Sequence, residues 1–192
     1  MVGGYTQYFT KVQGMPEKVL KQIESMIDDF VYAKKGEKKA NAIGIENLQR
    51  PYMDGGLNLL DVRARNDAVA LKVLQSYMEP PGNRPIWAYL VDRIFQICAV
   101  RRYQAVAPGL LINPFIQTWD VYTQAKGLPL VFKRMYNAGR KYNVSIRTWG
   151  PQPTLRLNMP YWWHVGTKDK LVSVYNDKWG RCLQHTHHLS SV

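Results

Sequence analysis

The stretch of sequence that decides the fold is PEKVLKQIESMIDDFV, residues 16–31. Its apolar residues recur every three or four positions, as they do along one face of an α-helix. Pro16 suits the first position of a helix, and Glu17 suits the positive end of the helix dipole. The apolar face consists of Val19, Leu20, Ile23, Met26, Ile27, Phe30 and Val31. We therefore expect a helix here whose apolar face is buried.

A second helix is expected downstream of this one, from Asp61 through Tyr77. Asp61 is a residue type that caps helix N-termini, and an apolar periodicity follows it. The expected inner face of this helix consists of Ala64, Ala68, Leu71 and Leu74 or Gln75. The residues of the first helix that we expect to pack against it are Leu20, Ile23, Ile27 and Phe30.

Prolines mark the starts of further helices, because proline is favoured at the first helical position. Pro85 is expected to open a helix that reaches Cys98, and Pro129 one that reaches about Tyr142. An Asn-Pro pair precedes residues 115–119 and predicts a short helix there.

The expected fold is therefore mainly α, an irregular helical bundle with at most a short β-hairpin. Asp54-Gly55 is the one convincing hairpin signal, so any strand pairing is expected within residues 43–60. A cluster of prolines and a glycine suggests a linker at residues 79–84. It would separate a helical region, residues 1–78, from a second one, residues 85–192.

Charge is distributed very unevenly along the 192 residues. The formal net charge is +12, but residues 1–100 carry 13 basic and 11 acidic side chains, whereas residues 101–192 carry 13 and 3. Such a basic half attracts polyanions, and the candidates are nucleic acid, an anionic membrane or an acidic protein. The alternative is a protein of high pI without a polyanionic partner.

Composition limits the environment of the chain. Apolar residues make up 46% of it, enough for a core, and no run approaches the roughly 18 apolar residues that span a bilayer. We therefore expect no membrane partner. Two cysteines do not make a disulfide framework, so we expect an intracellular chain.

No pattern of a catalytic site is recognisable, and we expect no cofactor. Phosphate-binding glycine motifs are absent. Asp28 and Asp29 are neighbours on a helix and point about 100° apart, so they do not converge on one metal ion. Cys182, His185 and His187 are weak candidates for zinc, because a closed site normally uses two separated ligand pairs. His164 lies in an aromatic run and is more typical of a packed ring than of a base.

Basic and aromatic residues alternate most densely in the second half, which holds 13 of the 23 aromatic residues. Lys133, Arg140 and Lys141 can share one face of the expected helix that Pro129 opens. Basic side chains neutralise phosphates, and aromatic rings can stack on unpaired bases. We expect Trp87, Trp119 and Trp163, however, to belong to the core. The predicted nucleic-acid contacts are Lys34, Lys35, Lys38, Lys39, Arg63, Arg65, Arg101, Arg102, Lys133, Arg134, Arg140 and Lys141.

Several short motifs, spread over most of the chain, carry a resemblance to a known family. They are GGYTQY (3–8), VQGMP (12–16), IDDFVY (27–32), GGLNLLDVRARNDA (55–68), RPIWA (84–88), INPFIQTW (112–119), PYWWHVG (160–166) and CLQxTH (182–187, with any residue at 185). In this combination the chain resembles the region after the polymerase palm in fungal LINE-type (non-LTR) retrotransposon reverse transcriptases. It departs from that pattern at Tyr32, where such elements usually carry Trp.

The resemblance implies a thumb-like region over residues 1–78 that steers a template-primer duplex, followed by a connector over residues 85–192. The aromatic-Ala-Asp-Asp strand of the palm and the fingers have no counterpart here. Polymerase activity is therefore not carried over, and we do not expect an enzyme. The implied partners are RNA or DNA and the remainder of a reverse transcriptase, and the implied location is the nucleus rather than the cytoplasm.

Three functions thus compete. The first is a nucleic-acid-binding thumb and connector that grips the template-primer backbone without catalysis. The second is an autonomous helical interaction or relic protein without a nucleic-acid role. The third is an enzyme with an unrecognised site at His164 or in residues 182–188. Charge asymmetry favours the first over the second, and the lack of a nucleophile beside a base counts against the third.

Overall fold

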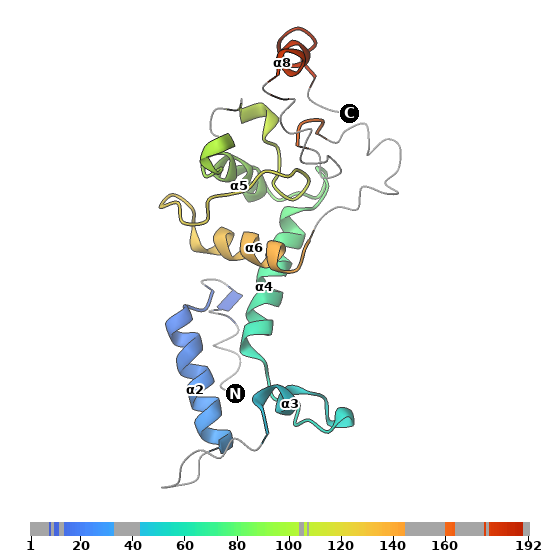
Figure 1. The fold of residues 1–192 in the computed structure, drawn as a ribbon. Coiled ribbons are helices and arrows are strands. Elements are labelled where there is room, and N and C mark those ends of the chain that lie inside the picture. Colours follow the sequence, from blue (N-terminus) through green and yellow to red (C-terminus); the bar gives the residue numbers. More distant parts are fainter. Residues whose placement is uncertain are drawn as a thin grey trace. The chain divides into compact units, whose positions relative to one another are not determined.

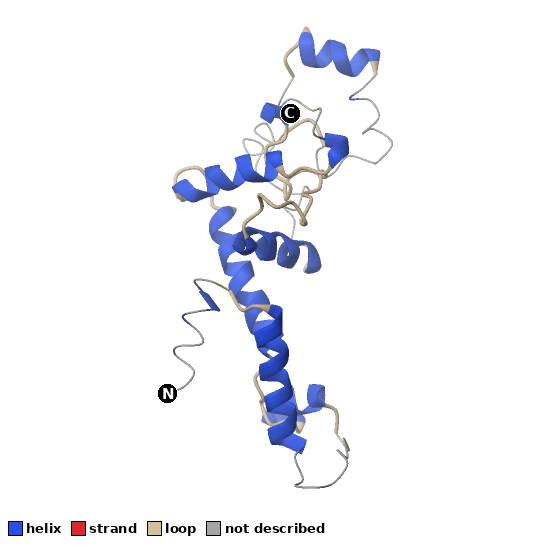
Figure 2. Ribbon diagram, turned by 90° about the vertical axis from the view of Figure 1, so that its left-hand side faces the viewer, coloured by secondary structure: helices blue, strands red, loops and turns tan. Residues whose placement is uncertain are grey.

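The computed structural model describes residues 8, 10, 11, 14–32, 43–103, 106, 108–144, 160–163, 175 and 177–189. Within them the chain is mainly helical, as expected, and Figure 2 shows helices and loops without a strand. The α-helices, labelled in Figure 1, are α2 (Glu17–Tyr32), α3 (Ile45–Gln49), α4 (Val62–Tyr77), α5 (Ile86–Ile97), α6 (Leu130–Lys141) and α8 (Lys178–His185). Short 3₁₀ turns are η1 (Tyr52–Asp54), η2 (Arg101–Tyr103) and η3 (Pro108–Leu110). No helix in this part of the chain is long and apolar enough to cross a membrane.

The chain divides into two compact units, Met1–Val73 and Leu74–Val192, so that the division falls inside α4. The expected linker at residues 79–84 lies within the second unit. It is held there by Arg84, whose guanidinium reaches both the carbonyl of Tyr77 and the carboxylate of Asp92.

In the first unit, α2 and α4 are connected by ion pairs. Arg63 of α4 meets Glu17 at 3.1 Å and Glu24 at 2.6 Å. These acidic residues and the buried Leu20 lie on one side of α2, because they are three, four or seven positions apart. Contact with α4 therefore involves one edge of the broad apolar face of α2.

The rest of that apolar face is half-buried or exposed, and the expectation that α2 buries Phe30 was wrong. The side chain of Phe30 is 89% exposed and that of Met26 is 68% exposed. The expected inner face of α4 was also wrong in part: Ala64, Ala68 and Gln75 are exposed, whereas Val62 and Leu74 are buried.

The Asp-Gly signal marks a tight turn without a hairpin. Residues 52–54 form a 3₁₀ turn, and Gly55 follows with φ 78°, a left-handed conformation that favours glycine. The chain then folds back on α3, where the amides of Leu57 and Leu59 both donate to the carbonyl of Leu48. A Cβ at Gly56 would lie 2.0 Å from the carbonyl oxygen of Arg50, so only glycine fits this return.

In the second unit, aromatic rings from four segments form the core. Tyr77 at the end of α4 meets the rings of Phe95 on α5 and Phe115 at centroid distances of 5.8 and 6.1 Å. Tyr136 on α6 contacts both phenylalanines, at 5.8 and 5.7 Å. Trp87 packs in this region as expected, at 5.9 Å from the ring of Phe132.

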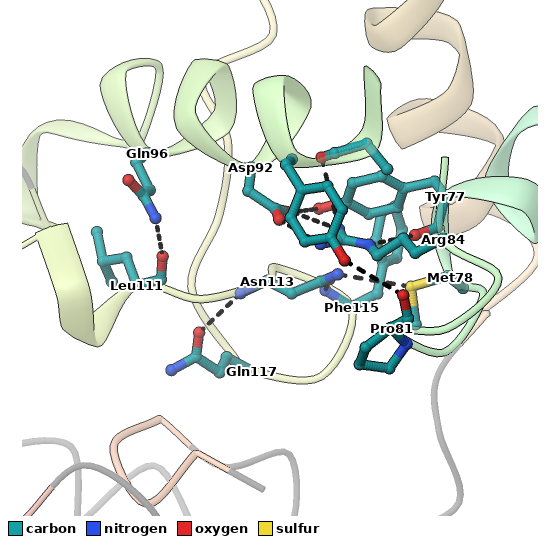
Figure 3. Close-up of polar contacts among 12 residues, drawn as sticks. Tyr77, Met78, Pro81, Arg84, Asp92, Gln96, Leu111, Asn113, Phe115 and Gln117 are labelled. Atoms are coloured by element: carbon teal, nitrogen blue, oxygen red, sulfur yellow. Dashed lines mark hydrogen bonds and ion pairs between the residues drawn. The ribbon is translucent and has the colours of Figure 1, made fainter. Parts of the chain in front are cut away.

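A polar network crosses one edge of this core (Figure 3). The buried hydroxyl of Tyr77 donates to Asp92 at 2.6 Å, and Arg84 binds the same carboxylate. Burial raises the pKa of Tyr77, and the neighbouring Asp92 carboxylate raises it further. The phenol therefore remains a neutral donor that ties α4 to α5.

The expected short helix at residues 115–119 is instead an irregular turn built around Gln117. Its Oε1 accepts from the amides of Ile112 and Asn113 and from the indole of Trp119. Its Nε2 donates to two carbonyls, those of Leu110 and Trp162. The local helix propensity does not decide the structure here. One buried amide side chain forms hydrogen bonds with several backbone groups that would have other partners in a helix.

Candidate nucleic-acid interface

The basic residues of α6 follow one side of a well-packed helix. Pro129 precedes it and Tyr142 ends it, as the sequence predicted. The buried side consists of Met135, Tyr136, Ala138 and Gly139. The helical positions of Lys133, Arg134, Arg140 and Lys141 place them within about 120° of one another on the other side.

Asp120 forms ion pairs with two of the predicted nucleic-acid-binding residues, which come from distant parts of the chain. The Nη2 of Arg102, in η2, lies 3.4 Å from Asp120 Oδ2. Arg140, on α6, forms an ion pair with Oδ1 of the same carboxylate. We call Arg102, Asp120 and Arg140 the Asp120 cluster; Arg101 and Lys141 adjoin it in sequence and are both exposed. The cluster and these neighbours carry four cations and one carboxylate.

Tyrosine rings contact both arginines of the cluster. The guanidinium of Arg140 lies 5.6 Å from the ring centroid of Tyr136, and its Nε donates to the Tyr136 hydroxyl at 3.1 Å. The guanidinium of Arg102 lies 4.7 Å from the ring of Tyr103. Burial raises the pKa of both tyrosines. Both phenols are therefore neutral at physiological pH, and they orient the guanidinium groups without cancelling their charge.

The ion pairs of the cluster are open to solvent. The side chains of Arg102 and Arg140 are 66% and 44% exposed, and that of Asp120 is 39% exposed. Ion pairs at such exposure typically contribute about 0–1 kcal/mol to stability. Loss of these two ion pairs would therefore cost the fold little, and the Tyr136 hydroxyl also donates to Asp120 Oδ1 at 3.3 Å.

The predicted contacts in the first unit have other surroundings. Arg63 is occupied by Glu17 and Glu24, whose hydrogen bonds raise its pKa. Arg65 is half-buried, and its Nη2 has no hydrogen-bond partner. The four lysines of the expected basic loop, Lys34, Lys35, Lys38 and Lys39, lie outside the described residues.

The alternative chemistries receive no support from the geometry. Nowhere in the described ranges do three His, Cys, Asp or Glu side chains gather as metal ligands would, although these ranges include Cys182, His185 and His187. Burial raises the pKa of the Cys98 thiol and so disfavours a reactive thiolate. His164 lies outside the described residues.

The sequence predicted the basic residues but not their arrangement. Asp120 is one of three acidic residues in residues 101–192, and nothing in the sequence pattern indicates that it meets Arg102 and Arg140. Lys178, Trp179 and Arg181 on α8 were also missed, although the exposed ring of Trp179 lies between two cations in sequence. Comparison with protein-family models, characterised proteins and solved structures finds no significant match to this chain.

Proposed function

We propose that this chain binds nucleic acid through the sugar-phosphate backbone, without catalysis, as an accessory region that grips a template-primer duplex. The observation that carries the proposal is the Asp120 cluster, where arginines 38 positions apart converge on one exposed carboxylate. The motif resemblance to the thumb and connector of LINE-type reverse transcriptases supports the same role. Such a region would act inside the cell, in the nucleus, with the remainder of a reverse transcriptase.

The chemistry of binding follows from the shape of the guanidinium group. Its planar array of donors matches two oxygens of a phosphate as well as two oxygens of a carboxylate. Asp120 thus occupies the position that a phosphate would take, and it keeps Arg102 and Arg140 together in the free protein. Lys133, Arg134 and Lys141 extend the positive charge along α6, where further phosphates of a backbone can bind.

The test is a salt titration of duplex binding by the variant Lys133→Ala/Arg140→Ala/Lys141→Ala. Phosphate contacts carry little sequence information, so we expect the variant to bind all duplexes more weakly and to the same extent. The slope of log affinity against log salt should flatten by about two or three, at about 0.9 per lost contact. An unchanged affinity and slope would show that this face of α6 is not the binding site.

One observation favours the second candidate, a helical interaction protein without a nucleic-acid role. Val19, Met26 and Phe30 expose an apolar stripe at helical spacing on α2. On this alternative, duplex binding would be weak, would vanish by physiological salt and would not respond to single residues. The same titration therefore separates the two candidates.

A further inference from the structure

The short helix α8 is firmly attached to the second unit by its inner side. Gly180 is buried, and the amide of Gln184 donates to the carbonyl of Tyr175 at 2.8 Å. Just past the helix, the carbonyl of Leu189 accepts from the indole of Trp162 at 2.6 Å. Asp177 caps the first turn, where its carboxylate accepts from the amide of Lys178.

The exposed positions of α8 carry cations and one indole: Lys178 lies about 100° from Trp179 around the helix, and Arg181 lies on the opposite flank. Lys178, Arg181 and His185 are all exposed, and the side chain of Trp179 is 72% exposed. A tryptophan usually buries most of its large apolar surface, so this exposure is unusual. In the part of the chain that the structure describes, no ion pair involves Lys178 or Arg181.

We infer that the side of α8 that carries Trp179 and Lys178 binds a single-stranded segment of nucleic acid. The indole of Trp179 stacks on an unpaired base, and Lys178 beside it binds a phosphate of the same strand. Proteins that hold single strands use this combination, since a base offers a flat face to an aromatic ring and its backbone offers charge to the cations. The inference rests on the proposed function, because it adds a second contact to the same nucleic acid.

Selectivity for unpaired bases follows from the position of the indole. In a duplex both faces of each base are already stacked on neighbours, so an exposed ring on a helix surface cannot reach them. The Asp120 cluster, in contrast, recognises phosphates, which duplexes and single strands share. The two sites together would hold a duplex and the unpaired strand that extends from it.

An anionic membrane surface is the other partner that a helix with Trp, Lys and Arg can contact, and the packing of α8 disfavours it. Membrane-surface helices insert a whole apolar face into the lipid interface. In α8, Leu183 is half-buried and Gly180 is buried, so Trp179 is the single large apolar side chain of the helix that is exposed. One indole without such a face favours stacking over insertion.

The experiment compares Trp179→Ala with Trp179→Phe in the full chain, using a thymidine homopolymer and a duplex of equal length. Loss of one stacked base costs about 1–3 kcal/mol, so Trp179→Ala should weaken homopolymer binding about 5- to 140-fold. Trp179→Phe should retain most of the affinity, because a phenyl ring still stacks. Duplex binding should stay within about twofold for both variants, and this also shows that they are folded.

Other outcomes separate this inference from the proposed function. If the Lys133, Arg140 and Lys141 variant weakens binding but Trp179→Ala leaves homopolymer affinity unchanged, the inference about α8 is overturned and the proposed function stands. If the unaltered protein binds neither probe at low salt, both are overturned. If Trp179→Ala affects binding to phosphatidylserine vesicles and not to the homopolymer, α8 is a membrane contact instead.

Discussion

Phe95 and Phe30 occupy similar positions in two apolar helical stripes and have opposite environments. Phe95 is fully buried between Tyr77 and Tyr136, whereas Phe30 is 89% exposed on α2. Truncation of a buried phenylalanine removes apolar burial and leaves a cavity, but truncation of an exposed one removes little that folding had buried.

We therefore expect Phe95→Ala to lower the free energy of unfolding by about 3–5 kcal/mol, and Phe30→Ala to change it by less than about 1 kcal/mol. Urea unfolding followed by circular dichroism measures both, and each variant is the control for the other. A loss of several kcal/mol for Phe30→Ala would show that the whole apolar face of α2 is buried, as its sequence pattern predicted.

The sequence identified α2 as a helix because periodicity reports which residues share a face. It could not report what covers that face, because the covering residues come from another element. Arg63 of α4 pairs with Glu17 and Glu24 at the edge of the stripe, and a charge pair of this kind leaves no periodic signal. The same limit explains why the exposure of Ala64 and Ala68 on α4 was not predicted.

At Gly139, α6 lies so close to its neighbours that there is no room for a Cβ. A Cβ at this position would lie 2.5 Å from Cε1 of Phe115 and 2.8 Å from Cδ2 of Leu74. Both neighbours belong to the aromatic core, which has little room to move. The glycine thus sets how closely α6, and with it Arg140, approaches the core.

Gly139→Ala should therefore destabilise the protein by about 1–3 kcal/mol, even though alanine is the better helix former. Gly127→Ala is the matched control, because a Cβ there meets nothing within 4 Å. Thermal unfolding of the two variants is the measurement. Equal stability of both would mean that the contact between α6 and the core is looser than described.

At the scale of the whole molecule, the helical class and the starts of most helices followed from the sequence, because prolines and apolar spacing are local signals. The turn around Gln117 did not, since one of its hydrogen bonds joins residues 45 positions apart in the chain. The same distinction holds for the candidate site. Its basic residues could be predicted from composition, whereas their convergence on Asp120 depends on tertiary packing.

The central claim is that the Asp120 cluster is a phosphate site that a carboxylate fills in the free protein. The most direct test is duplex affinity, across a salt series, for Asp120→Asn beside Asp54→Asn. Both variants lose one negative charge, but Asp54 lies in the exposed turn of the first unit. We expect Asp120→Asn to bind duplex severalfold more tightly than Asp54→Asn, because it frees Arg102 and Arg140 for phosphate. Equal affinities for the two variants would contradict the claim and leave only a general effect of net charge.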